Sequence, residues 1–130
     1  MRIDPAAVLH SYITGLAEFA DVMVSVSMIG RTKGMPSIVL DPTGGYCVVR
    51  HRADRAEFTI NSYDSAVASS AARAFALRDH LLEDLPGRVA GGALVLDVVE
   101  VHMPFFLPDM TSGEFRHVHS IAVYLTEASL

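Results

Sequence analysis

The residues most able to carry chemistry in this 130-residue chain are its six histidines. His117 and His119 are two positions apart, so on a strand they would share one face, and His102 could lie opposite them on a paired strand. Three imidazoles that converge in this way are able to hold zinc. The spacing has little specificity, because no cysteine or carboxylate completes an established ligand pattern. We therefore favour an interfacial or solvent-facing histidine pair over a metal site.

Motifs for catalysis or phosphate binding are missing from the sequence. No serine stands in a Gly-x-Ser-x-Gly elbow, and no glycine-rich phosphate loop is present. Asp97 and Glu100 are three apart in an apolar run, which places them on opposite faces of a regular strand and prevents an acid/base pair. We expect no enzyme activity and no cofactor. The single cysteine, Cys47, lies in an apolar run, and we expect it to be a small buried hydrophobe in a reducing compartment.

A basic cluster made by Arg50, His51, Arg52 and Arg55 is the other candidate site. Arg50, Arg52 and Arg55 could contact phosphate or an acidic partner, since guanidinium groups bind both. The simpler interpretation is a solvated loop, and we favour it.

The composition bounds the function further. Hydrophobic residues make up 51% of the chain and charged residues only 19%, which is more apolar surface than a small monomer can hide. We expect the surplus to form subunit contacts. The net charge of -5 argues against a dedicated nucleic-acid binder. No apolar run approaches the roughly 20 residues that span a bilayer, so we expect no membrane partner.

Hydrophobic periodicity and turn residues predict how these side chains are positioned. The predicted elements are a helix from Asp4-Pro5 to Phe19 or Ala20, strands at Val22–Ile29, Ser37–Leu40, Tyr46–Arg50 and Ala56–Tyr63, a long helix capped by Asp64 or Ser65 and ending near Leu85, a mobile link at Gly87–Gly92, and a hairpin over Leu94–Leu125. Asp41-Pro42 and the glycines that follow predict a turn after the second strand. This order predicts one α+β domain over residues 1–130, with a mostly antiparallel sheet of about five strands covered by two helices and a long C-terminal β-hairpin.

The connection within that hairpin, Pro104–Phe115, has an unusual composition for a solvent-exposed loop. It contains two prolines, three phenylalanines, a leucine and a methionine. We interpret it as a contact with another subunit or protein. The residues assigned to this contact are Phe105, Phe106, Leu107, Met110, Phe115 and Arg116.

A series of features in the second half of the chain resembles a known family. The series is an aromatic-polar strand end at Phe58–Tyr63, an Ala-, Arg- and Leu-rich helix at Ala66–Leu85, a strand at Leu94–Met103, Leu107-Pro108-Asp109, Phe115-Arg116 and a last strand at Ser120–Leu125. In order and spacing this resembles the tail-terminator, or tail-completion, proteins of long-tailed bacteriophages. The short strand and paired glycines of Ser37–Gly45 also fit.

The resemblance implies a small α+β subunit that forms a ring of six copies on the phage tail tube. Such a ring stops tube polymerisation and offers a docking surface to the head connector, without catalysis, cofactor or metal. The implied partners are further copies of the chain, the major tail-tube protein and a head–tail connector or head-closure protein, while genomic DNA passes through the ring without sequence-specific binding. The implied location is the head-proximal end of the tail in the virion, after assembly in the host cytoplasm.

Two other functions remain open at this stage. One is a different neck component of similar size, such as a head-closure or tail-adaptor protein. The other is a small-molecule-binding α+β regulatory domain, in which the C-terminal hairpin and the long helix flank a ligand cleft.

Overall fold

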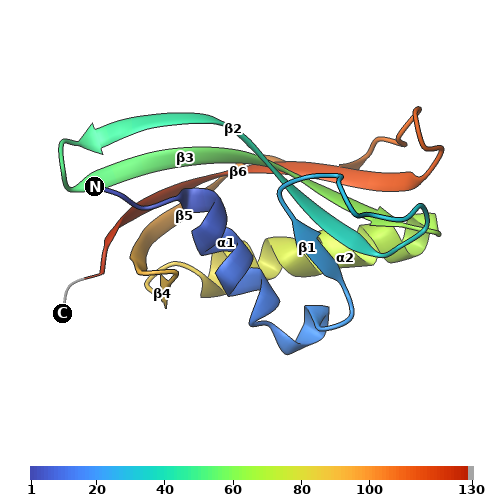
Figure 1. Cartoon of the computed structure of the whole chain (residues 1–130), viewed down its shortest axis with the longest axis horizontal. Helices are drawn as coiled ribbons and strands as arrows, with labels where there is room; N and C mark the ends of the chain where they lie inside the picture. Colours follow the sequence, from blue (N-terminus) through green and yellow to red (C-terminus); the bar gives the residue numbers. More distant parts are fainter. Residues whose placement is uncertain (129–130) are drawn as a thin grey trace.

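A computed structural model describes residues 1–128, and a six-stranded sheet is its central element. The strand order is β1-β2-β3-β6-β5-β4, and both α-helices lie on one side of the sheet (Figure 1). The elements are α1 (Pro5–Thr14), a 3₁₀ turn η1 (Ala17–Phe19), β1 (Met23–Ser25), β2 (Ser37–Val49), β3 (Ala53–Asp64), α2 (Val67–Asp79), a π-helical segment η2 (His80–Asp84), β4 (Val89–Ala90), β5 (Ala93–Phe106) and β6 (Phe115–Glu127). The predicted α+β class and the antiparallel C-terminal pair are confirmed, with six strands in the described part of the chain instead of five.

Helix α1 begins as predicted and ends earlier. The Asp4 side chain accepts a hydrogen bond from the Ala6 backbone N–H at 3.0 Å, and Pro5 occupies the first helical position. The helix stops at Thr14, because Gly15 closes it and Leu16 turns extended. The predicted end at Phe19 or Ala20 is therefore wrong, although the separate turn η1 still buries Phe19.

Helix α2 reaches the predicted end near Leu85 by changing its winding. Beyond Asp79 the chain continues as a π-helix, and the Leu85 N–H donates to the His80 carbonyl at 3.0 Å. The predicted cap is wrong. Asp64 accepts from Arg73 at 2.8 Å instead, and the helix starts after Ala66 without a side-chain cap. Ala74, Leu77, Leu81 and Leu85 recur at helical spacing and are buried, while Val67 is exposed.

Strand β2 replaces the two short strands and the turn that the sequence predicts. It runs through Pro42 and the paired glycines, with a bulge between Pro42 and Gly44. Gly45 is needed for close approach, because a Cβ there would lie 2.0 Å from the Arg55 carbonyl oxygen. The real turn is at Arg50–Arg52, where the Arg52 N–H donates to the Val49 carbonyl at 2.9 Å.

Both edge strands of the sheet are short, and β4 is the one that the sequence does not predict. Strand β1 is shorter than the predicted Val22–Ile29, because Ser25 and Ser27 hydrogen-bond to the local backbone and turn the chain out of the sheet. The predicted mobile link contains β4, which pairs with Ala93 and Leu94 of β5. Both edge strands therefore cover only a short part of their neighbours.

The core lies between the two helices and strands β3, β6 and β5. Large apolar side chains from all of these elements are fully buried there, among them Leu9, Phe58, Leu81, Ile121 and Leu125. The second half of β2 receives no such cover, and every residue from Asp41 to Arg50 is exposed. Cys47 is therefore exposed, and the expectation that it is buried is wrong.

Candidate functional site

The connection between β5 and β6 is shorter and more ordered than the sequence predicts. Phe105 and Phe106 belong to β5, so the connection comprises only residues 107–114. The Leu107 N–H donates to the Arg116 carbonyl at 2.9 Å, and the Asp109 N–H donates to the Glu114 carbonyl at 3.0 Å. These bonds close the loop on itself and fix the direction in which its side chains point.

The pleat of the strands divides the predicted contact residues between the two faces of the sheet. Phe106 lies opposite His117 on the helix side, and its ring is 6.2 Å from that of Phe115. Phe105 lies opposite Val118 on the other face, with its ring 5.3 Å from that of His102. The predicted contact is thus two aromatic groups at one end of the molecule.

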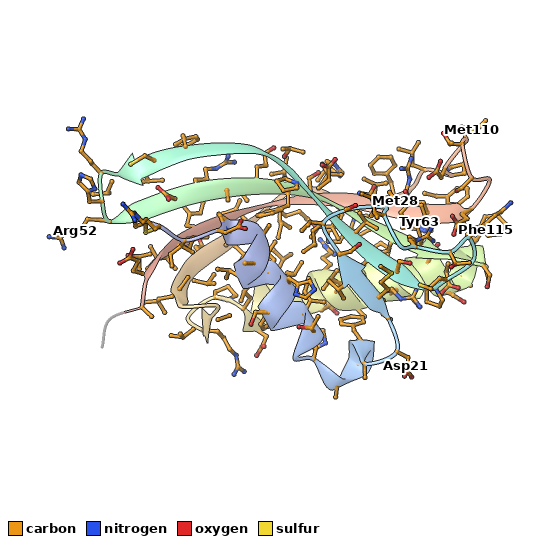
Figure 2. All side chains as sticks on the ribbon, in the orientation of Figure 1. Asp21, Met28, Arg52, Tyr63, Met110 and Phe115 are labelled. Atoms are coloured by element: carbon orange, nitrogen blue, oxygen red, sulfur yellow. The ribbon has the colours of Figure 1, made fainter. Side chains whose placement is uncertain are left out.

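Apolar exposure at this end is large. The side chains of Phe105, Phe106 and Leu107 are each more than two-fifths exposed, and Met110 at the loop tip is 90% exposed. Figure 2 shows Met110 and Phe115 at the same end of the molecule as Met28. Exposed apolar side chains in this number are typical of a protein contact.

Arg116, another predicted contact residue, makes bonds within the chain. Its Nε donates to the Leu107 carbonyl at 2.9 Å, and its guanidinium lies 5.8 Å from the centre of the Tyr63 ring. Arg116 therefore supports the loop that carries Leu107 and Met110, and these intramolecular contacts already engage its Nε.

A buried ion pair, Arg31–Glu114, holds a second loop against the first, and no pattern in the sequence predicts it. Glu114 accepts from both terminal nitrogens of Arg31 and from the Gly34 backbone N–H at 2.9 Å. Arg31 also donates to Ser37 at 2.7 Å and stacks over Tyr63 at 4.1 Å. Because Arg31 donates to it, the pKa of Glu114 falls to about 2.

This pair fixes the loop between β1 and β2, residues 26–36, beside the β5–β6 loop. The loop adds further exposed apolar side chains, Val26, Met28 and Ile29, of which Ile29 is 88% exposed. Met28 and Ile29 of this loop, together with the exposed residues of the β5–β6 loop and its flanks, form what we term the apolar end of the molecule: Met28, Ile29, Phe105, Phe106, Leu107, Met110 and Phe115. The signal that could have shown it is the run of apolar residues before Gly30, which the sequence analysis assigned to a strand.

The predicted basic residues are split. Arg50 and Arg52 are exposed at the β2–β3 turn, and Figure 2 places Arg52 at the opposite end from Met110. Arg55 lies in β3, where it donates to Glu57 at 3.0 Å and to the Tyr124 hydroxyl at 3.2 Å. A single three-arginine patch is therefore not formed, and two arginines mark the basic end.

The three histidines considered for zinc do not converge. His102 shares a hydrogen bond with Ser120 at 2.8 Å on the helix-free face, whereas His117 shares one with Ser70 of α2 at 2.8 Å. His119 is fully buried on the helix side, and neither ring nitrogen has a partner. Burial lowers the pKa of His119 to about 4. Within residues 1–128 no group of three metal-ligating side chains is assembled.

A ligand cleft between the hairpin and the long helix is also not formed. Leu77 of α2 and Leu81 of η2 belong with Val98 and Ile121 to the common core, which fills that space with side chains. The surface hollows lie elsewhere, between α2 and η1 and beside the C-terminal half of α1. None of the helices described in residues 1–128 is long and apolar enough to cross a membrane.

The fold defines a class before any relative is considered: a small α+β protein whose antiparallel sheet has helices on one face and a bare opposite face. No protein-family model and no curated protein matches the chain. Among solved structures, a chain of the structure described as "Virion of native gene transfer agent (GTA) particle" shares the fold, with a TM-score of 0.67. The likeness covers 93% of this chain and 92% of that chain at 16% sequence identity.

Proposed function

We propose that this protein is a structural subunit of a phage-like virion, and that it acts as a tail terminator. Copies of the chain form a ring on the last layer of the tail tube, stop its polymerisation and offer a surface to the head connector. Support comes from the likeness to a chain of a gene transfer agent particle along nearly the whole length of both chains. The order of sequence features, which resembles the terminator family, supports the narrower role.

The observation that carries the proposal is the apolar end. Leu107 and Met110 are held outward by a closed loop, and the buried Arg31–Glu114 pair fixes the neighbouring loop beside it. A rigid, exposed apolar surface loses little conformational entropy on binding, so it suits a permanent contact. We assign this end to the contact with the tube or with a neighbouring subunit.

The net charge of the chain suits the passage of DNA. The net charge of -5 disfavours retention of a polyanion, since phosphate binding grows with cationic charge. In this proposal DNA slides through the ring without sequence-specific contacts, and no catalysis, cofactor or metal is involved.

The direct test is replacement of Phe105, Phe106 and Leu107 by serine. Their side chains are partly in solvent, so the variant should remain folded by circular dichroism. We expect it to lose ring formation and tube capping, measured by light scattering and by negative-stain images of tubes grown with the protein. The matched control replaces the exposed α2 residues Val67 and Phe75 by serine and should assemble normally. Normal capping by the triple variant would refute the assignment.

A second neck role agrees with the same fold likeness, because the likeness is to a chain of a virion particle and does not state a position in it. A head-closure or tail-adaptor protein should bind the portal side and leave tube length unchanged. Incubation of the purified chain with tail-tube subunits separates the two: a terminator shortens and caps the tubes, whereas an adaptor does not.

A further inference from the structure

Strand β2 has an open edge that is unusual for a protein in water. Strand β1 pairs only with Ser37, Ile38 and Val39, so the rest of β2 has a neighbour on one side alone. From Pro42 to Val49 it carries no charged side chain, and Tyr46, Val48 and Val49 are all about half exposed. Edge strands are usually short, charged or covered, because a free edge pairs with other strands. Pro42 and its bulge protect only the beginning of this one.

Strand β5 has a second open edge at the other side of the sheet. Strand β4 pairs only with Ala93 and Leu94, so from Leu96 to Phe106 the single partner of β5 is β6. Besides Phe105 and Phe106 of the apolar end, the exposed large apolar side chains along this stretch are Leu96, Val99, Val101 and Met103.

The two edges have complementary directions. The pairs β2–β3, β3–β6 and β6–β5 are all antiparallel, so β2 and β5 run in opposite directions. When β5 of one copy lies beside β2 of the next, the antiparallel alternation continues without interruption. This contact joins two different surfaces, and repetition of such a head-to-tail contact closes a ring.

The charges at the edges agree with the same arrangement. Arg50 and Arg52 stand at the β2–β3 turn, at the end of the sheet where β5 begins. Asp97 is exposed near the beginning of β5, and Glu127 ends β6 beside Ala93. A neighbouring copy would therefore place its basic turn beside these carboxylates.

We propose that the β2 edge of one copy, centred on Gly44–Val49, pairs antiparallel with the β5 edge of the next copy, centred on Leu96–Met103. The paired sheets form a continuous wall, with the helices of every copy on the same side. This inference rests on the proposed ring and names the contact between its subunits. Pairing of two β2 edges would instead make a dimer and leave β5 open.

Cys47 allows a direct test, because it is the only cysteine and it is exposed on the β2 edge. A new cysteine is placed on β5 at Leu96, Glu100 or Val101, one per variant. Glu100 is chosen because it lies on the same face of the sheet as Cys47. The assembled protein is oxidised and analysed on a non-reducing gel. Disulfides form between Cα atoms less than about 7 Å apart, a distance that neighbouring strands satisfy. We expect at least one position to give a ladder of covalent oligomers up to the full ring.

Two controls separate this contact from chance collisions. The same β5 variants with Cys47→Ser should give no ladder, and a variant with a cysteine at the exposed α2 residue Ser69 should also give none. A Cys47–Cys47 dimer formed efficiently by the unmodified chain would overturn the inference in favour of β2–β2 pairing.

The outcomes distinguish this inference from the proposed function. Rings seen by light scattering, without a ladder from any of the three positions, overturn the strand pairing and leave the ring standing. A ladder that grows into open filaments supports the pairing and refutes the closed ring. A chain that stays monomeric both alone and with tail-tube subunits overturns both proposals.

Discussion

The buried imidazole of His119 should make the stability of this protein depend on pH. Both ring nitrogens lack a hydrogen-bond partner, and the side chain is fully buried between β6 and α2. Charged neighbours oppose one another: Glu100 on β5 raises its pKa, while His102 on β5 and Arg78 on α2 lower it. Burial exceeds these effects, and the pKa falls from 6.5 to about 4.

The sign and the size of the effect follow from this shift. Between pH 6.5 and pH 4 the unfolded chain binds a proton at His119 and the folded chain does not, so the free energy of unfolding falls as the pH falls. Each unit of pKa difference corresponds to about 1.4 kcal/mol. The wild type should therefore lose roughly 2 kcal/mol from this residue between pH 6.5 and pH 4.5. The His119→Leu variant should lose none of it.

The measurement is urea unfolding followed by circular dichroism at four pH values from 7.5 to 4.5, at a protein concentration at which light scattering reports a monomer. Other groups titrate as well, including His117, whose pKa is also lowered by burial. The difference between wild type and variant isolates His119, and His51→Asn at the exposed β2–β3 turn is the matched control. Equal losses of stability in wild type and His119→Leu between pH 6.5 and 4.5 would refute the reasoning.

Three further predictions concern the buried Arg31–Glu114 pair, the close backbone approach at Gly45 and the charges at the two strand edges. Glu114→Gln should lower the free energy of unfolding by about 3 kcal/mol at pH 7, because it leaves the guanidinium of Arg31 buried without its counter-charge. The wild type, but not the variant, should also lose stability as the pH falls from 4.5 to about 2. Urea unfolding measures both effects. Gly45→Ala should cost about 1–3 kcal/mol through contact with the β3 backbone, and an unchanged thermal midpoint would contradict the close approach. Arg50→Glu should weaken rings at low salt, and adding Asp97→Lys should restore them, as measured by light scattering; failure of that rescue would argue against the charge pairing.

The sequence predicted the parts of the fold that depend on local patterns. The cap by Asp4 and Pro5, the long helix that ends near Leu85 and the pairing of β5 with β6 all follow from side-chain types at regular spacing. The sequence predicts a turn at Pro42 where the structure has a bulge. Proline followed by glycines is typical of a turn as long as the partner strand is not known. Only the position of β3 shows that Gly45 serves a close backbone approach.

The exposed apolar residues of the candidate site could be selected from the sequence, whereas its long-range contacts could not. The exposed residues Phe105, Leu107 and Met110 were selected from composition alone, which was enough because apolar residues flanked by prolines stood out. The Arg31–Glu114 pair joins residues 83 positions apart, so no spacing rule in the sequence indicates it. The same limit applies to the histidines, whose opposite faces follow from irregular pairing of β5 between Glu100 and His102.

A run of apolar residues can belong to a buried central strand or to an exposed edge strand, and only the neighbours of the strand distinguish the two. Strand β6 has a partner on each side, and its residues from His117 to Val123 are buried on both faces. Strand β2 has such a run at Tyr46–Val49 and β5 has the apolar residues Leu96, Val99 and Val101, yet both strands lie where one neighbour stops short. Their apolar side chains are exposed for that reason, so the hydrophobic surplus of the sequence lies at the two open edges and the apolar end. An excess placed at two complementary edges of one sheet is what a repeating head-to-tail assembly requires.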